Sequence, residues 1–484
     1  MTAEEAPLTR SVKPAIVLAG TGEVVDHLHL EDRSARLAAL LHQHGLRPGD
    51  TVAVLAGQSA AAFAVVASAR RSGLFLLPLD PSLSLEELAY AINVSVARVL
   101  FVAEEFAEAG ASLRPLTPYV QVRYSLDNPF EDHRPVGLAR SAAVARRAEG
   151  RAAGTLHYSV AATGRPVGYA VPDPVADHAG QCDLAAMLGP AVVDDSTVLV
   201  SATSLSDAVA AQLVTAVLVA RGCVVTPARP TAVDLLRAAF EWDATILHVS
   251  PLEAVGMAKL DPERRRRLTP PSLELVLLSV PGCPPHVARS LVETWGDAVR
   301  QVYVGPGVGV LTAVSGRDLV TNPGSVGRPV GPAIRFQDDG LIEAEDPTRP
   351  GEWRSWGDRG SVDGFGHLHL SDRSAFTLEP GGELVVPRDL EVALVTHPGV
   401  ADVAVVGLLE AGARSVTVFV EPAAGARPGR ELEAELLDFL RARVPALWVP
   451  ARIEFTSSLP RTASGKLDKR RLGPHDPLST GAIL

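Results

Sequence analysis

The stretch Leu37-Ala-Ala-Leu-Leu-His-Gln-His-Gly45-Leu-Arg-Pro-Gly-Asp50-Thr-Val-Ala-Val-Leu-Ala56 indicates an α/β fold. Its leucines recur at the spacing of one helix face, and Gly45 can end that helix in the left-handed conformation. Arg-Pro-Gly-Asp50 then supplies a turn. The apolar run after Asp50 is too short for a helix and is rich in β-branched residues, so it predicts a buried strand.

The same alternation continues along the chain. Thr197-Val-Leu-Val-Ser201 and Thr245-Ile-Leu-His-Val249 are further short apolar runs that predict buried strands, and helix-period segments separate them. Strands that alternate with helices favour an α/β fold with largely parallel sheets.

Composition excludes several classes of protein. The chain has 484 residues, of which 47% are hydrophobic and 21% charged, so a large core can form and disorder is excluded. The chain has 45 Lys and Arg residues and 56 Asp and Glu residues, which gives a formal charge of -11. This negative charge argues against nucleic acid or a membrane surface as a binding partner.

Targeting features point to the cytoplasm. Cys182, Cys223 and Cys283 lie far apart, without the paired spacing of disulfide frameworks, zinc sites or redox motifs. The acidic pair Glu4-Glu5 stands where a signal peptide carries positive charge. No apolar run approaches the roughly 20 residues of a membrane span. We therefore expect a cytoplasmic protein.

The last hundred or so residues differ from the rest. Val403–Val406 and Val416–Val420 predict two strands connected through 407–414, and a helix follows with Leu432, Leu436, Phe439 and Leu440 on one face. We expect a large N-terminal multi-sheet α/β domain over residues 1–371 and a small C-terminal α+β lid domain over 372–484. The segment 340–360 is rich in Pro, Gly and charge and is expected to be loop.

The sharpest motif is Leu459-Pro-Arg-Thr-Ala-Ser-Gly-Lys466-Leu-Asp-Lys-Arg-Arg-Leu472. A bare lysine cluster is usually a solvated basic tail. The whole string, however, resembles the catalytic-lysine motif of the adenylate-forming superfamily, which comprises acyl- and aryl-CoA synthetases, peptide-synthetase adenylation domains and luciferases. The resemblance implies that Lys466 contacts the acid carboxylate and the α-phosphate while the acyl-adenylate forms. A mobile cation at this position can bridge the carboxylate and the phosphate, two anions that have to approach each other for the reaction to occur.

Further motifs resemble the same superfamily in the same order along nearly the whole chain. Trp356-Gly-Asp358-Arg-Gly360 is similar to the motif whose aspartate bonds both ribose hydroxyls, and the resemblance gives that role to Asp358. Asp372-Arg373 resembles the domain-junction motif, so Arg373 is expected to help hold the ribose. The other matching segments are Gly45–Asp50, Leu77–Ser82, Ala244–Pro251, Gly324–Pro329, Gly381–Pro387 and His397–Val400.

The phosphate loop departs from the family pattern. The aligned stretch is Tyr158-Ser-Val-Ala-Ala-Thr-Gly-Arg-Pro-Val-Gly168. Such loops surround the β- and γ-phosphates with hydroxyls and backbone amides. Here Val160, Ala161, Ala162 and Val167 replace a serine, a glycine, a threonine and a lysine of the family. The candidate ligands that remain are Ser159, Thr163, Gly164 and Arg165, and a strand-turn that binds nothing is an equal alternative.

The metal motif departs as well. Val304-Gly-Pro-Gly-Val308 aligns with the family's Tyr-Gly-x-Thr-Glu, so Val308 stands where the magnesium-binding glutamate belongs. Magnesium needs hard oxygen ligands, which valine lacks. Gly305 keeps the motif's glycine, and Gly282 keeps one glycine of the loop that approaches the adenine. We assign no metal ligand.

Histidine pairs offer a weaker alternative for metal. His27-Leu-His29 and His367-Leu-His369 would place two imidazoles on one strand face, but no third ligand lies nearby in sequence. Tyr303 and Trp356 are interpreted as packing aromatics around the nucleotide cleft.

Two functions follow from the resemblance. The first is an atypical acyl- or aryl-acid ligase that uses ATP to form an acyl-AMP and passes the acyl group to CoA or to the phosphopantetheine thiol of an acyl carrier protein. ATP or AMP is then the nucleotide, and Val308 argues against magnesium. The second is a non-adenylating homologue that binds an acyl thioester or a protein partner, or runs ATP-independent acyl chemistry in the same cleft.

Overall fold

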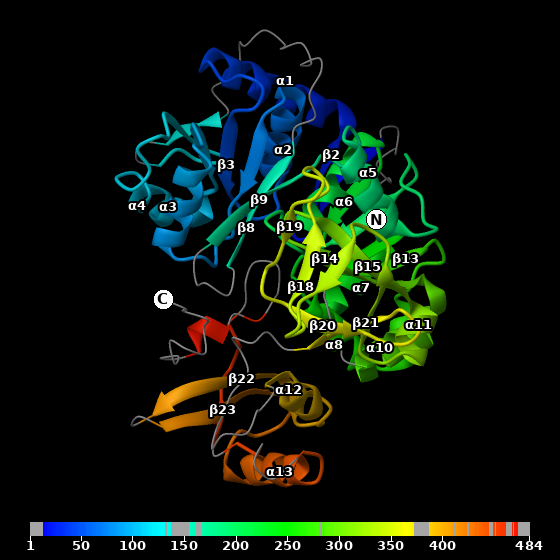
Figure 1. Ribbon diagram of the computed structural model, residues 1–484. Coiled ribbons are helices and arrows are strands. Elements are labelled where there is room, and N and C mark those ends of the chain that lie inside the picture. Colours follow the sequence, from blue (N-terminus) through cyan, green and yellow to red (C-terminus); the bar gives the residue numbers. More distant parts are fainter. Residues whose placement is uncertain are drawn as a thin grey trace, which may run out of the picture.

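The computed structural model describes most of the chain (Figure 1). The described residues are 13–130, 133–136, 154–160, 166–279, 283, 285–371, 387–410, 413–423, 425–444, 449–450, 452–460, 467 and 469–472. Among them lie a large N-terminal domain with two extended sheets and a small C-terminal domain with a sheet of its own. The predicted fold class, a large α/β domain followed by a small α+β domain, is confirmed.

The first sheet of the large domain has the strand order β7-β6-β5-β3-β4-β8-β9. Its neighbours pair in parallel from β7 to β8, and β8 and β9 form an antiparallel hairpin. The strands are β3 (Thr51–Leu55), β4 (Phe75–Pro78), β5 (Val99–Val102), β6 (Val122–Ser125), β7 (Arg134–Pro135), β8 (Thr155–Val160) and β9 (Pro166–Val171).

The second sheet has the order β2-β1-β11-β10-β12-β13-β14-β15-β16-β21-β20. Pairs from β1 to β14 are parallel, and those from β14 to β20 are antiparallel. Its strands are β1 (Pro14–Leu18), β2 (Glu23–Asp26), β10 (Val198–Ser201), β11 (Cys223–Thr226), β12 (Ile246–Val249), β13 (Leu275–Leu278), β14 (Val299–Gly305), β15 (Gly309–Ser315), β16 (Ser325–Pro329), β20 (Arg359–Val362) and β21 (Leu368–Ser371).

Helices fill the connections between the strands and cover the sheets (Figure 1). Apolar faces of these helices pack on the strands and build the main cores. The helices are α1 (His27–Gln43), α2 (Ala60–Ser72), α3 (Leu85–Val94), α4 (Ala107–Ser112), α5 (His178–Leu188), α6 (Ala208–Val219), α7 (Ala232–Glu241), α8 (Pro251–Ala258), α9 (Pro262–Arg267), α10 (Pro285–Trp295) and α11 (Gly316–Thr321).

The opening of α1 corrects one expectation. His27 and His29 begin this helix and do not lie on a strand, because Asp26 caps it by accepting a hydrogen bond from the His29 backbone N–H at 2.8 Å. At the other end of the helix, Gly45 adopts a φ of 72°, the left-handed conformation predicted for it.

The expectation of a loop over 340–360 holds only in part, because short strands interrupt the segment. This segment contributes β18 (Ile342–Glu345) and β19 (Trp353–Arg354), which form a small antiparallel sheet with β17 (Ile334–Phe336). Ile342 and Ala344 point into an apolar cluster and are fully buried, which holds the short strands in place despite the Pro, Gly and charge around them.

The small domain contains α12 (Pro387–Val395), β22 (Val400–Glu410), β23 (Ala413–Pro422), α13 (Arg430–Arg441) and β24 (Arg452–Phe455). The connection expected over 407–414 is largely strand, since β22 continues to Glu410 and β23 begins at Ala413. Leu432, Leu436 and Leu440 of α13 are buried against this sheet, as predicted. The proposed domain boundary at Asp372 lies outside the described residues.

One lysine joins the two domains. Lys259, at the end of α8, donates hydrogen bonds to the backbone oxygens of Val400 at 2.5 Å and Ala401 at 2.6 Å. Burial lowers the pKa of Lys259, while Asp402 and Glu421 act in the opposite direction. No helix among the described residues has the length and apolarity needed to cross a membrane.

Candidate active site

Asp358, the residue expected to hold the ribose, is fixed by two aromatic side chains. The Tyr303 hydroxyl donates to its Oδ2 at 2.8 Å, and the Trp356 indole N–H donates to the same oxygen at 2.7 Å. Trp356 Nε1 also lies 3.0 Å from the Tyr303 oxygen. Both rings are buried, while Asp358 is half-buried. The two aromatics therefore pack as predicted and also orient the carboxylate.

The hairpin that joins β14 to β15 carries Gly305 and Val308. Val308 is 2% exposed and packs with Tyr303, Leu311 and Trp356 in an apolar cluster. A Cβ at Gly305 would lie 2.5 Å from Val308 Cγ2 and 2.8 Å from the Trp356 ring, so this position accepts glycine only. Close packing explains why the chain keeps Gly305.

The residues at this hairpin do not fit magnesium. Val308 offers no oxygen ligand and its side chain is enclosed by carbon. Within the described ranges, no group of three His, Cys, Asp or Glu side chains is placed to hold a metal ion. We derive no step through magnesium at Val308.

The expected phosphate loop lies at the tip of the β8–β9 hairpin. Ser159 is opposite Val167 in the antiparallel ladder, and Val160 is opposite Pro166. The three other predicted ligands, Thr163, Gly164 and Arg165, lie outside the described residues. The described part of the stretch is therefore two paired antiparallel strands.

Three more predicted site residues, Gly282, Arg373 and Lys466, also lie outside the described residues. The chain beyond Lys466 is described at Lys469, which forms an ion pair of 2.8 Å with Glu391 of α12. Glu391 Oε1 also accepts the Val405 backbone N–H at 2.7 Å. Lys469 is thereby tied to the small domain.

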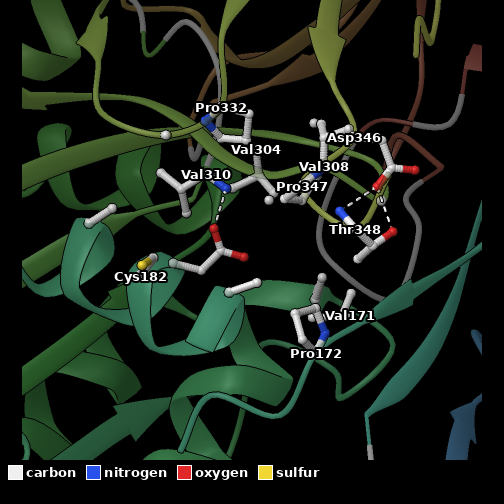
Figure 2. A pocket seen from close by; sticks show the side chains of 18 of the residues that line it. Val171, Pro172, Cys182, Val304, Val308, Val310, Pro332, Asp346, Pro347 and Thr348 are labelled. Atoms are coloured by element: carbon white, nitrogen blue, oxygen red, sulfur yellow. Dashed lines mark hydrogen bonds between the residues drawn. The ribbon is translucent and has the colours of Figure 1, made fainter. Parts of the chain in front are cut away.

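A cavity of about 540 Å³ lies between α5, α6, the end of β9, the β14–β15 hairpin and the loop after β18 (Figure 2). This volume falls in the range of small-molecule sites. Small apolar residues form most of its wall. Those labelled in Figure 2 are Val171, Pro172, Val304, Val308, Val310, Pro332 and Pro347.

The β14–β15 hairpin connects this cavity with Asp358. Gly305 and Val308 line the cavity. The same two residues contact Trp356, whose indole N–H holds the Asp358 carboxylate. Val308 and Trp356 thus link the cavity to the carboxylate expected to bind ribose.

Two polar residues in the cavity wall were not found from the sequence. Asp183 of α5 is 8% exposed, and Gln212 of α6 is 4% exposed. A signal for each was present. Asp183 lies on the buried face of its helix between Gly180 and Met187, and Gln212 interrupts an almost wholly apolar helix. A buried polar residue on such a face calls for a partner or a function.

Comparison with known proteins identifies the family. The description "AMP-binding enzyme" matches residues 4–352, and "AMP-binding enzyme C-terminal domain" matches residues 389–466. A feruloyl-CoA synthase of Amycolatopsis sp is 28% identical over 488 residues, covering 93% of this chain and 95% of that protein.

Two further proteins are similar over nearly their whole length. The fatty acid–[acyl-carrier-protein] ligase ScoC of Streptomyces coeruleorubidus is 27% identical over 506 residues, covering 95% of this chain and 92% of its own. The structure of the amide bond synthetase McbA from Marinactinospora thermotolerans superposes with a TM-score of 0.73 at 25% identity, covering 95% of this chain and 96% of that one.

Proposed function

The chain belongs to the AMP-binding enzyme family, the adenylate-forming superfamily that its motifs resemble, and from this premise we propose that it activates a carboxylic acid as an acyl-adenylate and transfers the acyl group to a thiol. The observation that carries the proposal is the link from the apolar cavity through Val308 and Trp356 to Asp358. An acid held in the cavity and a nucleotide held at Asp358 are neighbours across the β14–β15 hairpin.

The reaction has two steps. A carboxylate oxygen attacks the α-phosphorus of ATP, the bond to the β-phosphate oxygen breaks, and pyrophosphate leaves. A thiol then attacks the acyl carbon, AMP leaves, and the thiol proton passes to solvent. CoA and a carrier protein both present a phosphopantetheine thiol, so either can be the acceptor. The feruloyl-CoA synthase and the fatty acid–carrier protein ligase support these two kinds of acceptor.

The chain supplies charge and orientation. We assign Asp358 to the ribose hydroxyls, with Tyr303 and Trp356 fixing the direction of its carboxylate. Lys466 and Arg373 are assigned to the acyl–phosphate junction and the ribose, as the resemblance implies. A bridging lysine lowers the repulsion between substrate carboxylate and phosphate, and loss of such a contact commonly costs about 10²–10³ in rate.

The cavity favours an acid with an apolar body. Its walls come mainly from Ala, Gly, Val and Pro side chains, and burial of apolar surface stabilises a bound ligand by roughly 25 cal/mol per Å². A volume of about 540 Å³ suits a compact acyl or aryl group.

A second function is favoured by one observation. Val308 is enclosed in an apolar cluster where a metal glutamate is expected, which fits a homologue that binds an acyl thioester without using ATP. The two functions differ in whether ATP is consumed.

Acyl-AMP formation tests the proposal. The wild-type protein, Lys466→Ala and the control Lys13→Ala are incubated with ATP, magnesium and a panel of aryl and fatty acids, and acyl-AMP is detected by mass spectrometry. Lys13 is remote from the site and pairs with the exposed Asp195. We expect acyl-AMP from the wild type and the control, and a loss of about 10²–10³ in rate for Lys466→Ala. No acyl-AMP from any acid contradicts the proposal.

A further inference from the structure

Two carboxylates of the cavity wall, Asp183 and Glu345, form no ion pair among the described residues, and Asp183 is the more deeply buried of the two. Asp183 lines the cavity on α5, and its Oδ1 accepts the Val310 backbone N–H at 2.8 Å (dashed at Val310 in Figure 2). Among the described residues no Lys, Arg or His forms an ion pair with it. A buried carboxylate without a counter-charge lowers the stability of the folded state. Its presence in the cavity wall is therefore better explained by a role in binding than by stability.

The backbone is shaped to admit this carboxylate. Gly309 has a φ of 89°, and a Cβ there would lie 2.3 Å from Asp183 Oδ1 and 2.6 Å from Oδ2. Any other residue at this position would push the carboxylate away. Close approach of Asp183 to the strand end therefore depends on Gly309, next to the hairpin that separates the cavity from Asp358.

Gln212 completes a polar pair with Asp183. Its side-chain amide lies close enough to the Asp183 carboxylate to oppose the rise in the pKa of that group. Because an ionised carboxylate only accepts, the amide NH₂ must face it. The Gln212 Oε1 atom is left without a hydrogen-bond partner among the described residues. The acceptor atoms of the pair are thus the Asp183 carboxylate oxygens and Gln212 Oε1.

The other acidic groups of the wall are already engaged. Asp346 accepts the Thr348 backbone N–H at 2.8 Å and the Arg354 Nε–H at 2.7 Å. Glu345 Oε1 accepts the Gly351 backbone N–H at 2.9 Å. Asp183 and Gln212 therefore remain as the acceptor group best placed to meet a ligand in an otherwise mainly apolar cavity.

We propose that Asp183 and Gln212 bind a hydrogen-bond donor, either a hydroxyl or an ammonium group, on the part of the acid substrate that lies away from its carboxylate. This inference rests on the proposed ligase function and names its substrate class. An ionised Asp183 repels the substrate carboxylate, so the acid must lie with its carboxylate away from α5 and its donor toward the pair. A matched donor in such a site gives strong discrimination because an analogue without it leaves the buried acceptors unpaired.

Burial is consistent with this role. It raises the pKa of Asp183 to about 6, while the Val310 hydrogen bond and the nearby Gln212 amide act to lower it. A donor from a ligand would stabilise the ionised carboxylate further.

Matched acids test the inference. Benzoate and cinnamate are compared with their 3- and 4-hydroxy, methoxy and aminomethyl derivatives, by calorimetric binding without nucleotide and by acyl-AMP formation with ATP. The methoxy group matches the hydroxyl in position but cannot donate. We expect at least one hydroxy or aminomethyl acid to exceed its methyl ether and its parent by about tenfold or more in affinity and in kcat/KM.

Variants identify the residues responsible. Asp183→Asn keeps an oxygen for the Val310 N–H but replaces the second oxygen by an amide donor, so the preference for a donor acid should fall below about threefold or reverse. Gln212→Met keeps the length of the side chain and should reduce the preference in the same direction. The controls are Asp195→Asn and Gln181→Met, which change exposed residues outside the cavity wall. Both controls should keep the preference for an acid with a hydrogen-bond donor.

The outcomes separate this inference from the ligase function. Acyl-AMP formation without preference for a donor overturns the inference and leaves the ligase standing. A donor preference in binding with no acyl-AMP supports the inference and overturns the ligase. Unchanged preference in both Asp183→Asn and Gln212→Met overturns the assignment to this pair, and so does the failure of every acid to bind.

Discussion

Tyr303 donates its hydroxyl hydrogen to Asp358 Oδ2 over 2.8 Å, although 55 positions separate the two residues in the chain. The bond joins β14, which carries the altered metal motif, to the loop before β20, which carries the retained ribose motif. A hydrogen bond thus connects the altered metal motif, which departs from the family pattern, with the ribose motif, which keeps that pattern.

Removal of this hydroxyl tests the positioning of Asp358. In Tyr303→Phe, Oδ2 loses the bond from the tyrosine hydroxyl and keeps the bond from the Trp356 N–H. A hydrogen bond to a charged group contributes about 1.5–3 kcal/mol, so we expect the KM for ATP to rise about tenfold with a smaller change in kcat. Tyr119→Phe, on an exposed tyrosine, is the matched control. An unchanged KM in Tyr303→Phe contradicts the positioning role.

Restoring the family's glutamate should not restore a metal site. Val308→Glu places a carboxylate among Tyr303, Leu311 and Trp356 at a position that is 2% exposed. We expect a loss of about 3 kcal/mol in the free energy of unfolding and no gain in ATP turnover. Val362→Glu, at a position 44% exposed, should change stability little. Chemical denaturation and pyrophosphate release measure the two effects, and a rise in turnover with Val308→Glu would refute this account of the hairpin.

Lys259 is predicted to hold the small domain against the large one. Its ammonium bonds to two backbone oxygens at Val400 and Ala401, which Lys259→Met would leave unpaired. We expect small-angle X-ray scattering to give a larger radius of gyration for Lys259→Met than for the wild type. Lys13→Met should scatter like the wild type. Identical curves for all three proteins would show that Lys259 does not set the arrangement.

The pH dependence of stability tests the burial of Asp183. Burial raises its pKa from 3.8 to about 6 in the folded state. Between these values the folded protein binds more protons than the unfolded chain, so this group's contribution to stability is present at low pH and is lost as pH rises through 6. The stability of Asp183→Asn relative to the wild type should therefore increase by about 2 kcal/mol from pH 4 to pH 7.

Urea denaturation at a series of pH values measures this difference, with Asp195→Asn as the exposed control. A difference between Asp183→Asn and the wild type that stays flat from pH 4 to 7 would mean that the Asp183 pKa is ordinary and that its carboxylate is solvated.

The sequence predicts the elements whose apolar residues form a short continuous run or recur along one face of a helix. Buried strands at β3, β10 and β12 and the buried leucines of α13 follow directly from apolar spacing. The short strands β18 and β19 do not, because tertiary contacts of Ile342 and Ala344 stabilise them and their own composition is that of a loop.

The candidate site divides in the same way. Asp358 and Gly305 lie in motifs that can be recognised in a linear string. Asp183, Gln212 and the opposite wall at Asp346 come from segments far apart in the chain, and only the fold brings them to one cavity. The sequence shows that they are polar residues on apolar helices, but their meeting in one cavity depends on how α5 packs against β14, β15 and α6.

The central claim is that the cleft still uses ATP despite its altered phosphate and metal motifs. Calorimetric titration of the purified protein with ATP, with and without magnesium, and with AMP alongside, tests this claim without a guess about the acid. The account predicts saturable binding of ATP as well as AMP. Binding of AMP alone, or of neither nucleotide, would contradict it.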